Sequence, residues 1–230
     1  MWIYYGSKSK IVHHYPTPKH DKIIEPFAGT AKYALKYWDR EVLLVDKYEV
    51  IIKIWKWLQE CSPKDILGLP RLKKGDNIKD MNLSEGEFLF LSFLTSGGTA
   101  IPCYTVSTYG EVSARGTYDK VAKNIHKIKH WEIMQASYDE IPNQKATWFI
   151  DPPYQFGGHR YKHSNKAIDF DKLSDWCQTR EGQSIVCENT KATWLPFKPV
   201  IKFQGQIHST IEAIWSNEVT AFDNEQLELF

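Results

Sequence analysis

The sequence predicts an α/β fold, namely a doubly wound, mostly parallel sheet with a small region inserted between its halves. Three observations support this fold class. The chain opens with a strand–helix–strand–helix pattern over residues 23–58. Short apolar runs with strand character return after residue 130. Between them, residues 61–130 hold only loop and helix signals. Alternating strands and helices imply parallel strands joined by right-handed crossovers.

The first four elements follow from short local signals. Residues 23–25 form an apolar run that ends in a proline and glycine turn, as strands often do. Thr30 is placed to cap a helix through residues 34–37. Residues 42–46 have the pattern of a buried strand, and the apolar spacing over residues 50–58 is that of an amphipathic helix.

The middle of the chain has weaker patterns. Residues 61–83 are rich in Pro, Gly and Lys and are expected to be loop, whereas residues 87–94 favour a helix. Residues 97–117 hold Gly, Ser, Thr and Tyr with little periodicity, so we expect a flexible insert there. Residues 118–130 predict a helix with apolar residues on one face and lysines on the other.

Strand patterns return in the last hundred residues, with a helix expected near Leu173–Trp176. The expected strands are residues 131–134, 147–150, 184–187, 200–203 and 211–215, the last two as a closing hairpin. We therefore expect one α/β domain from residues 1–60 and 131–220. Residues 61–130 would be its insert, and residues 221–230 an acidic C-terminal tail.

Composition limits the class of protein. With 42% hydrophobic and 25% charged residues, the 230-residue chain has an ordinary soluble composition and no membrane-length apolar run. Its start lacks the order of a signal peptide, and four cysteines without a CxxC pair favour reduced thiols in a cytoplasm. The eight histidines show no metal-ligand spacing, so we predict no metal site. We also expect a monomer that does not bind membranes.

The turn after the first strand predicts a nucleotide-like cofactor site. Such cofactors sit beyond the carboxyl ends of parallel strands, beside a glycine turn. The segment Glu25-Pro26-Phe27-Ala28-Gly29 occupies that place, and Asp46 ends the next strand 21 residues later, where a carboxylate can accept hydrogen bonds from ribose hydroxyls. An ordinary strand–turn–helix unit is the alternative interpretation of these residues taken alone.

The segment Asp151-Pro152-Pro153-Tyr154 is the candidate catalytic turn, because it directly follows an apolar strand. Two prolines make the backbone rigid and remove two donors. The Asp151 carboxylate and a backbone carbonyl can then accept both hydrogens of an exocyclic amine, and the carboxylate offsets positive charge that develops on the nitrogen. Tyr154 offers an aromatic face to a base that has left the duplex stack. A rigid structural turn is the alternative.

The chain resembles the Dam-like adenine-N6 DNA methyltransferases, a family often encoded by phages and known from restriction–modification systems. Four segments carry the resemblance in the family's order and span most of the chain. These are Tyr4-Tyr5-Gly6-Ser7-Lys8, Glu25-Pro26-Phe27-Ala28-Gly29, Ser137-Tyr138-Asp139 and the Asp-Pro-Pro-Tyr segment, which is the most specific. Ser7 and Ala31 stand where the family usually has glycine, and both are small.

The resemblance implies a Rossmann-like fold that binds S-adenosyl-L-methionine and methylates the adenine N6 amine in double-stranded DNA by base flipping. It implies that Tyr5, Gly6, Lys8, the Glu25–Gly29 turn and Asp139 bind the cofactor, the turn cradling its methionine part and Asp139 contacting its adenine. The region from 61 to 130 would be a short target-recognition insert.

Basic residues near these segments are candidates for contact with DNA. We predict phosphate or base contacts from Lys10, Arg115, Lys123, Lys127, Arg160 and Lys162. Solvated helix faces and a basic loop are the alternatives for these side chains.

The C-terminal tail ends in a short apolar motif. Gln226, Leu227, Leu229 and Phe230 resemble the peptide by which replication and repair proteins bind the bacterial sliding clamp. The alternative is that Leu229 and Phe230 pack on the protein's own sheet.

Other functions stay open at this stage. One is methylation of a different planar amine: cytosine N4 in DNA, adenine in RNA, or a protein glutamine. Those families more often have Ser or Asn where Asp151 stands, which favours adenine in DNA. Another is a DNA-binding or clamp-binding adaptor on the same fold that no longer catalyses, although Asp151 and Tyr154 would then be unnecessary.

Overall fold

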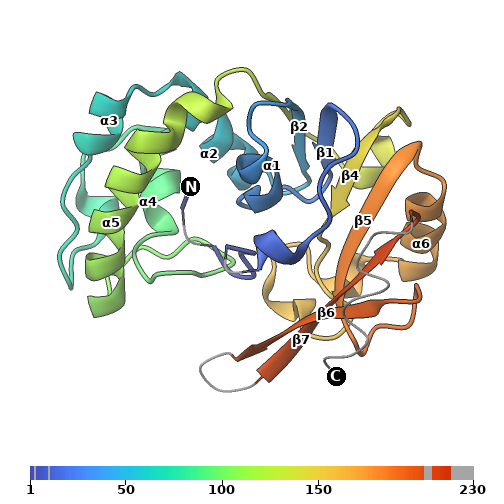
Figure 1. Ribbon diagram of the computed structural model, residues 1–230. Helices are drawn as coiled ribbons and strands as arrows, with labels where there is room; N and C mark the ends of the chain where they lie inside the picture. Colours follow the sequence, from blue (N-terminus) through green and yellow to red (C-terminus); the bar gives the residue numbers. More distant parts are fainter. Residues whose placement is uncertain (3, 10, 205–208, 219–230) are drawn as a thin grey trace.

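A computed structural model describes residues 1–2, 4–9, 11–204 and 209–218, with the side chains of residues 203–210 not described. Lys10 and the whole proposed clamp-binding motif lie outside the described residues. The described part contains a seven-stranded sheet in the order β3-β2-β1-β4-β5-β7-β6. In Figure 1 the insert helices stand on one side of this sheet and the β6–β7 hairpin extends from its other edge.

The sheet is mostly parallel. Strands β1 to β5 pair in parallel, whereas β7 is antiparallel to both β5 and β6. The seven strands are β1 (Lys22–Glu25), β2 (Glu41–Asp46), β3 (Glu132–Gln135), β4 (Ala146–Ile150), β5 (Gly182–Asn189), β6 (Lys198–Gln204) and β7 (Ser209–Ser216). This architecture confirms the predicted fold class, including the closing hairpin.

Alternate residues of the central strands enter two different cores, one on each face of the sheet. Ile23 of β1 packs with α1 (Lys32–Lys36) and α2 (Glu49–Glu60). The next residue, Ile24, packs with Leu173 and Trp176 of α6 (Phe170–Gln178) on the opposite face. Because successive strand residues point to opposite faces, a run of apolar residues is required where both faces are covered by helices. The sheet is therefore doubly wound, which means that helices cover both of its faces.

The insert is more helical than the sequence indicated. Its helices are α3 (Pro63–Leu67), α4 (Glu85–Ser92) and α5 (Thr108–Asn124). Helix α3 forms inside the stretch expected to be loop, because Ser62 and Asp65 make a capping box around it. Helix α5 begins at Thr108, well before the expected start at residue 118.

Gly110 explains why α5 begins earlier in the chain than expected. A Cβ atom at this position would lie 1.8 Å from the Thr95 carbonyl oxygen, so the glycine lets α5 pack closely against the preceding loop. Ser107 caps the helix by accepting a hydrogen bond from the Gly110 amide at 3.0 Å. In the sequence, the same glycine indicated irregular structure.

Short 3-10 turns complete the secondary structure, and α1 starts differently from expectation. Residue Ala31, not Thr30, precedes α1, with a left-handed φ of 46°. The 3-10 turns are η1 (Val12–His14), η2 (Ile78–Asp80), η3 (Ile125–Ile128), η4 (Tyr138–Glu140), η5 (Gly158–Arg160) and η6 (Asn165–Ala167).

No described helix is long and apolar enough to cross a membrane. The four cysteines are unpaired thiols.

Candidate active site

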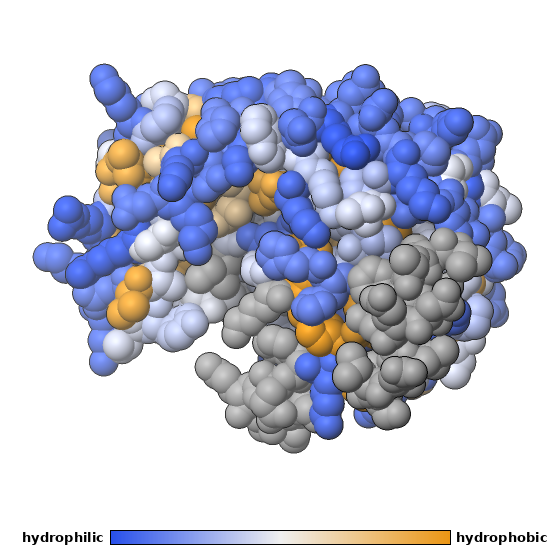
Figure 2. Space-filling view, viewed as in Figure 1, coloured by the Kyte–Doolittle hydropathy of each residue, from blue (hydrophilic) through white to orange (hydrophobic). Residues whose placement is uncertain are grey.

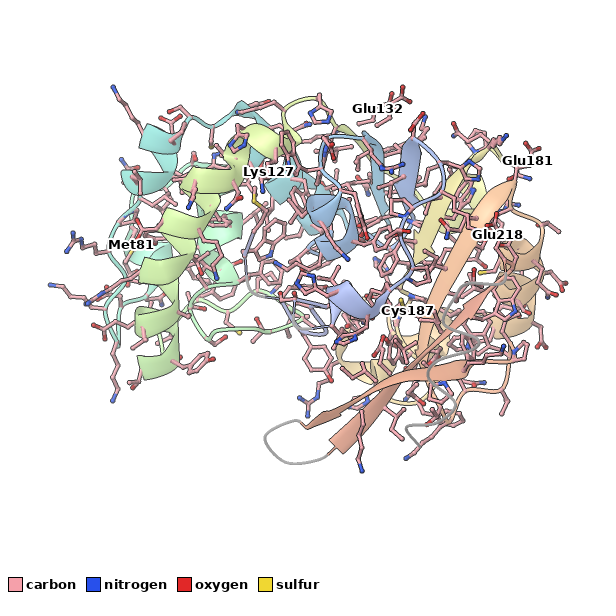
Figure 3. All side chains as sticks on the ribbon, viewed as in Figure 1. Met81, Lys127, Glu132, Glu181, Cys187 and Glu218 are labelled. Atoms are coloured by element: carbon pink, nitrogen blue, oxygen red, sulfur yellow. The ribbon has the colours of Figure 1, made fainter. Side chains whose placement is uncertain are left out.

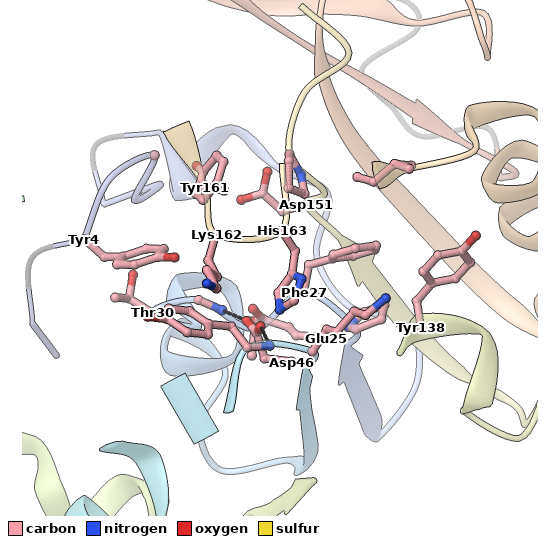
Figure 4. Close-up of a pocket in the computed structure, with 18 of the residues that line it drawn as sticks. Tyr4, Glu25, Phe27, Thr30, Asp46, Tyr138, Asp151, Tyr161, Lys162 and His163 are labelled. Atoms are coloured by element: carbon pink, nitrogen blue, oxygen red, sulfur yellow. Dashed lines mark hydrogen bonds between the residues drawn. The ribbon is translucent and has the colours of Figure 1, made fainter. Parts of the chain in front are cut away.

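The switch point of the sheet lies between β1 and β4. Strands β2 and β3 continue from β1 in one direction, whereas β5 continues from β4 in the other. A crevice opens beyond the carboxyl ends of parallel strands at such a point, and ligands of doubly wound folds bind there. A cavity of about 320 Å³ occupies this place, and we call it the smaller cavity. Figure 4 shows Glu25, Asp46 and Asp151 around it.

The turn after β1 is held by a buried carboxylate. One oxygen of Glu25 accepts a hydrogen bond from the Ala34 amide at 2.6 Å, which ties the turn to α1. Burial raises the pKa of Glu25 to about 8, although the Ala34 amide opposes this. Glu25, Gly29 and the residues between them line the smaller cavity, and their binding of a cofactor stays a prediction.

Asp46 fixes the same turn from the end of β2. Its two carboxylate oxygens accept hydrogen bonds from the Gly29 amide at 3.0 Å and the Tyr48 amide at 2.8 Å. Burial raises the pKa of Asp46 to about 6, and the two amides act in the opposite direction. Figure 4 shows both hydrogen bonds as dashed lines at the edge of the cavity. Asp46 therefore organises the turn at the edge of the smaller cavity.

A flat aromatic wall closes the cavity beside β3. The rings of Phe27 and Tyr138 are stacked, with centroids 5.6 Å apart. Asp139 lines the cavity next to them and forms an ion pair with Lys172 at 2.6 Å, whose hydrogen bond lowers the pKa of the Asp139 carboxyl. An aromatic wall with a neighbouring carboxylate suits a planar ring that carries an amino group.

Lys8 brings the N-terminal segment into contact with the catalytic turn. Its ammonium lies 2.7 Å from an Asp151 oxygen and 4.7 Å from the centroid of the Tyr154 ring. Burial raises the pKa of Asp151, and Lys8 partly opposes that effect. Burial would lower the pKa of Lys8, but Asp151 and Glu212 hold it above its ordinary value. The ion pair therefore partly offsets the cost of burying the Asp151 carboxyl group.

The loop that follows Tyr154 is rigidly held. The Gln155 amide donates to the Glu188 carboxylate, and Asn189 donates to the Phe156 carbonyl at 2.9 Å. A Cβ atom on Gly158 would lie 2.8 Å from the Pro153 backbone, so glycine is needed for this close approach. Strand β5 thus supports the catalytic turn from its own carboxyl end.

A second, much larger space adjoins this site, and we call it the larger cleft. It has a volume of about 1640 Å³ and is lined by parts of the N-terminal segment, α1, α5, the loop after Tyr154, and β7. Among its described lining residues, one carboxylate, Glu212, accompanies seven lysines. The lysines are Lys8, Lys32, Lys36, Lys120, Lys127, Lys191 and Lys202. Figure 2 shows hydrophilic side chains over most of the face seen in that view.

The two spaces meet at the N-terminal segment. Tyr4, Tyr5, Gly6, Ser7 and Lys8 line both of them, with Asp151 on the smaller cavity and Tyr154 on the larger cleft. The catalytic turn therefore lies at their junction.

The predicted DNA contacts fall into different places. Lys127 lines the larger cleft, and Figure 3 shows it near the end of α5. Arg115 and Lys123 lie on α5 but do not line the cleft, and Arg115 pairs with Glu111 at 3.5 Å. Arg160 lies over the Tyr5 ring, 5.5 Å from its centroid.

Lys162 lines the smaller cavity instead of the cleft. Its neighbour Tyr161 lines both and donates to the Tyr5 carbonyl at 3.3 Å. A Cβ atom on Gly6, whose φ is 73°, would lie 2.0 Å from the Tyr161 hydroxyl oxygen. The basic loop after the catalytic turn thus packs directly on the N-terminal segment.

Several residues of this site were not singled out from the sequence. Lys172, Tyr161 and Glu212 have no motif of their own, and only folding brings them to the cavity or the cleft. Lys120 differs from these three residues, because the sequence already indicated that it belongs to a basic helix face. Within the described residues, no group of three His, Cys, Asp or Glu side chains is arranged to hold a metal ion.

Comparisons with known proteins add little. No protein-family model and no curated protein sequence matches the chain. One solved structure that matches is described as "Putative methyltransferase yhhF from Escherichia coli". The match covers 93% of this chain and 81% of that chain, with a TM-score of 0.37 and 8% sequence identity. A likeness at this level supports no conclusion about activity.

Proposed function

We propose that this protein is an S-adenosyl-L-methionine-dependent methyltransferase that methylates the N6 amine of adenine in duplex DNA. The observation that carries the proposal is the position of the Asp151–Tyr154 turn. It follows β4 at the switch point of the sheet, where a cavity lined by Glu25 and Asp46 meets a lysine-lined cleft. A small dipolar cofactor suits the first space, and a polyanion suits the second.

The residues of the smaller cavity fit the chemistry of this cofactor. Asp46 would hold the ribose hydroxyls, and the Phe27–Tyr138 wall with Asp139 would hold the adenine ring. The carboxylate of Asp151 and the largely protonated Glu25 lie toward the reacting end. When bound, the cofactor supplies an electrophilic methyl group.

The catalytic turn acts on the acceptor amine. Lys8 occupies one oxygen of Asp151, which leaves the other oxygen free to accept an amine N–H. This contact draws the nitrogen lone pair out of conjugation with the ring, and the carboxylate stabilises the positive charge as the N–C bond forms and the S–C bond breaks. The methylated amine then releases its extra proton to solvent water. Tyr154 provides a ring against which a flipped base can stack.

The choice of adenine in DNA rests on the Asp at the first position of the turn and on the resemblance in the four segments. The direct test incubates the full-length protein with tritiated S-adenosylmethionine and unmethylated duplex DNA, followed by digestion to nucleosides. Label on N6-methyladenine supports the proposal. Label on cytosine would identify cytosine, not adenine, as the methyl acceptor. Absence of label with intact DNA binding would favour a silent adaptor.

A further inference from the structure

Glu212 on β7 is a buried carboxylate at the edge of the larger cleft. It is 9% exposed, and its Oε1 atom accepts a hydrogen bond from the Tyr15 hydroxyl at 2.7 Å. The same oxygen accepts a second hydrogen bond from the Tyr154 hydroxyl. A strand near the end of the chain therefore holds the ring of the catalytic turn, a link that spans 58 residues.

Tyr15 makes this contact rigid. Its ring is 2% exposed and packs against Phe149 of β4, with ring centroids 5.1 Å apart. Because Tyr15 is fixed in the core, Glu212 cannot turn away from Tyr154 without breaking a buried hydrogen bond. Breaking such a bond leaves an unsatisfied buried polar group, which is unfavourable.

Glu212 also changes the charge balance of the site. Lys8 is paired with Asp151 at 2.7 Å, so these two groups alone neutralise each other. Glu212 acts on the same ammonium and, together with Asp151, holds the pKa of Lys8 above its ordinary value against the effect of burial. Glu212 is thus a second carboxyl group that acts on the ammonium paired with Asp151.

The ionisable groups that act on Glu212 come from several elements around it. They are Lys8 of the N-terminal segment, Tyr15 before β1, Asp151 and Tyr154 after β4, and Cys187 of β5. Burial raises the pKa of Cys187 well above its ordinary value, so this thiol is neutral. Burial is also the main cause that raises the pKa of Glu212, with Lys8 opposing it and Asp151 adding to it.

We propose that Glu212 is a positioning residue for methyl transfer, which fixes the Tyr154 ring beside the flipped base and adds a second carboxylate to the buried cluster of Lys8 and Asp151. This inference rests on the proposed function. The amine gains positive charge as its new bond forms, and a preorganised negative charge in a desolvated site stabilises that state.

The first test is Glu212→Gln, which keeps the size and an acceptor oxygen but removes the charge. We expect kcat for DNA methylation to fall by about 10- to 100-fold, with little change in the KM for S-adenosylmethionine. The acid limb of the kcat–pH profile should also move to lower pH, because Asp151 no longer titrates against a second carboxylate. A purely structural role would lower stability without moving that limb.

A second variant separates the ring contact from the charge. Tyr154→Phe keeps the ring and removes the hydroxyl that donates to Glu212. We expect a smaller loss of kcat than in Glu212→Gln, and the double variant should lose less than the product of the two single effects, because both act on one unit. Glu218→Gln is the matched control, since this carboxylate follows β7, pairs with Lys19 and does not line the cleft.

The outcomes are distinguishable. A wild-type protein that transfers no methyl group to DNA refutes the proposed function. An active wild type with wild-type kcat and an unmoved acid limb in Glu212→Gln refutes the role of Glu212. If Glu212→Gln does not fold, as judged by circular dichroism, a wild-type kcat and pH profile in Tyr154→Phe refutes it instead.

Discussion

The smaller cavity and the larger cleft hold their charged groups in opposite ways. In the smaller cavity, Asp46 accepts two backbone hydrogen bonds, and Asp151 is fixed by Lys8. In the larger cleft, Lys120 and Lys191 are exposed on the wall of an open space. The first arrangement is preorganised for one small ligand in one pose. The second offers exposed cations that suit a polyanion, whose binding would release counterions.

Because the charges are fixed in one space and exposed in the other, binding in the two spaces should respond differently to salt and to mutation. Buried and fixed charges are screened little by salt, whereas exposed charges are screened strongly. The Asp151–Tyr154 turn lies at the junction, so a change there should affect transfer more than binding in either space.

The largest effect is expected at the junction itself. Asp151→Ala removes the acceptor for the amine, and transfer should fall by about 10²- to 10⁴-fold. Binding of the cofactor and of DNA should both remain measurable, because Asp46 and the cleft lysines are untouched. Single-turnover transfer and separate binding titrations check this. Equal losses of transfer and cofactor binding would contradict a role confined to the chemical step.

The next effect sharpens the description of the cleft. In the double variant Lys120→Ala/Lys127→Ala, duplex affinity should drop, and the slope of log affinity against log salt should fall by about 0.9 for each lost phosphate contact. The control is Arg115→Ala/Lys123→Ala, which removes two charges from α5 that do not line the cleft. Fluorescence anisotropy at several salt concentrations measures both. Equal losses in the two double variants would show that α5 binds DNA by a different face.

A smaller effect is expected from Phe156, which is 53% exposed in the larger cleft beside the catalytic turn. An apolar side chain there can enter the base stack when the target leaves it. Phe156→Ala should lower transfer to a matched duplex by about tenfold and spare a duplex with a mismatch at the target, because unstacking costs a few kcal/mol and mismatches lower it. Leu67→Ala, on a residue 55% exposed in α3, is the control. A uniform loss on both DNAs would rule out a role in flipping.

The smallest effect concerns stability and pH. Burial raises the pKa of Glu25 from 4.5 to about 8, so over this range the folded protein keeps a proton that the unfolded chain releases. The stabilisation is complete below pH 4.5 and is lost as pH rises through about 8. Glu25→Gln should therefore make Tm depend less on pH. Each kcal/mol of pH-dependent unfolding free energy that the substitution removes should change Tm by about 2–4 °C. A wild-type minus variant Tm difference that is constant from pH 5 to 8 would contradict this.

Local signals predicted the framework of the site. The apolar run of β1 with its glycine turn, the strand that ends at Asp46, and the turn at Asp151 are each encoded within a few residues, and the structure brings all three to one cavity. Parallel pairing makes this possible, since the carboxyl ends of β1, β2 and β4 share one edge of the sheet.

Contacts between distant elements were beyond local signals. Glu212 reaches Tyr154 only because β7 pairs with β5, and nothing near residue 212 indicates a site. The early start of α5 was missed for a related reason. Gly110 is a helix breaker in isolation, and only its packing against Thr95 shows why glycine is required inside this helix.

The most direct test of the central claim measures both ligands on one preparation of the protein. Equilibrium dialysis with labelled S-adenosylmethionine and anisotropy with duplex DNA are run at low and high salt. We predict saturable one-to-one cofactor binding that barely changes with salt, and duplex binding that weakens steeply with it. Folded protein that binds no S-adenosylmethionine at either salt concentration would contradict the account.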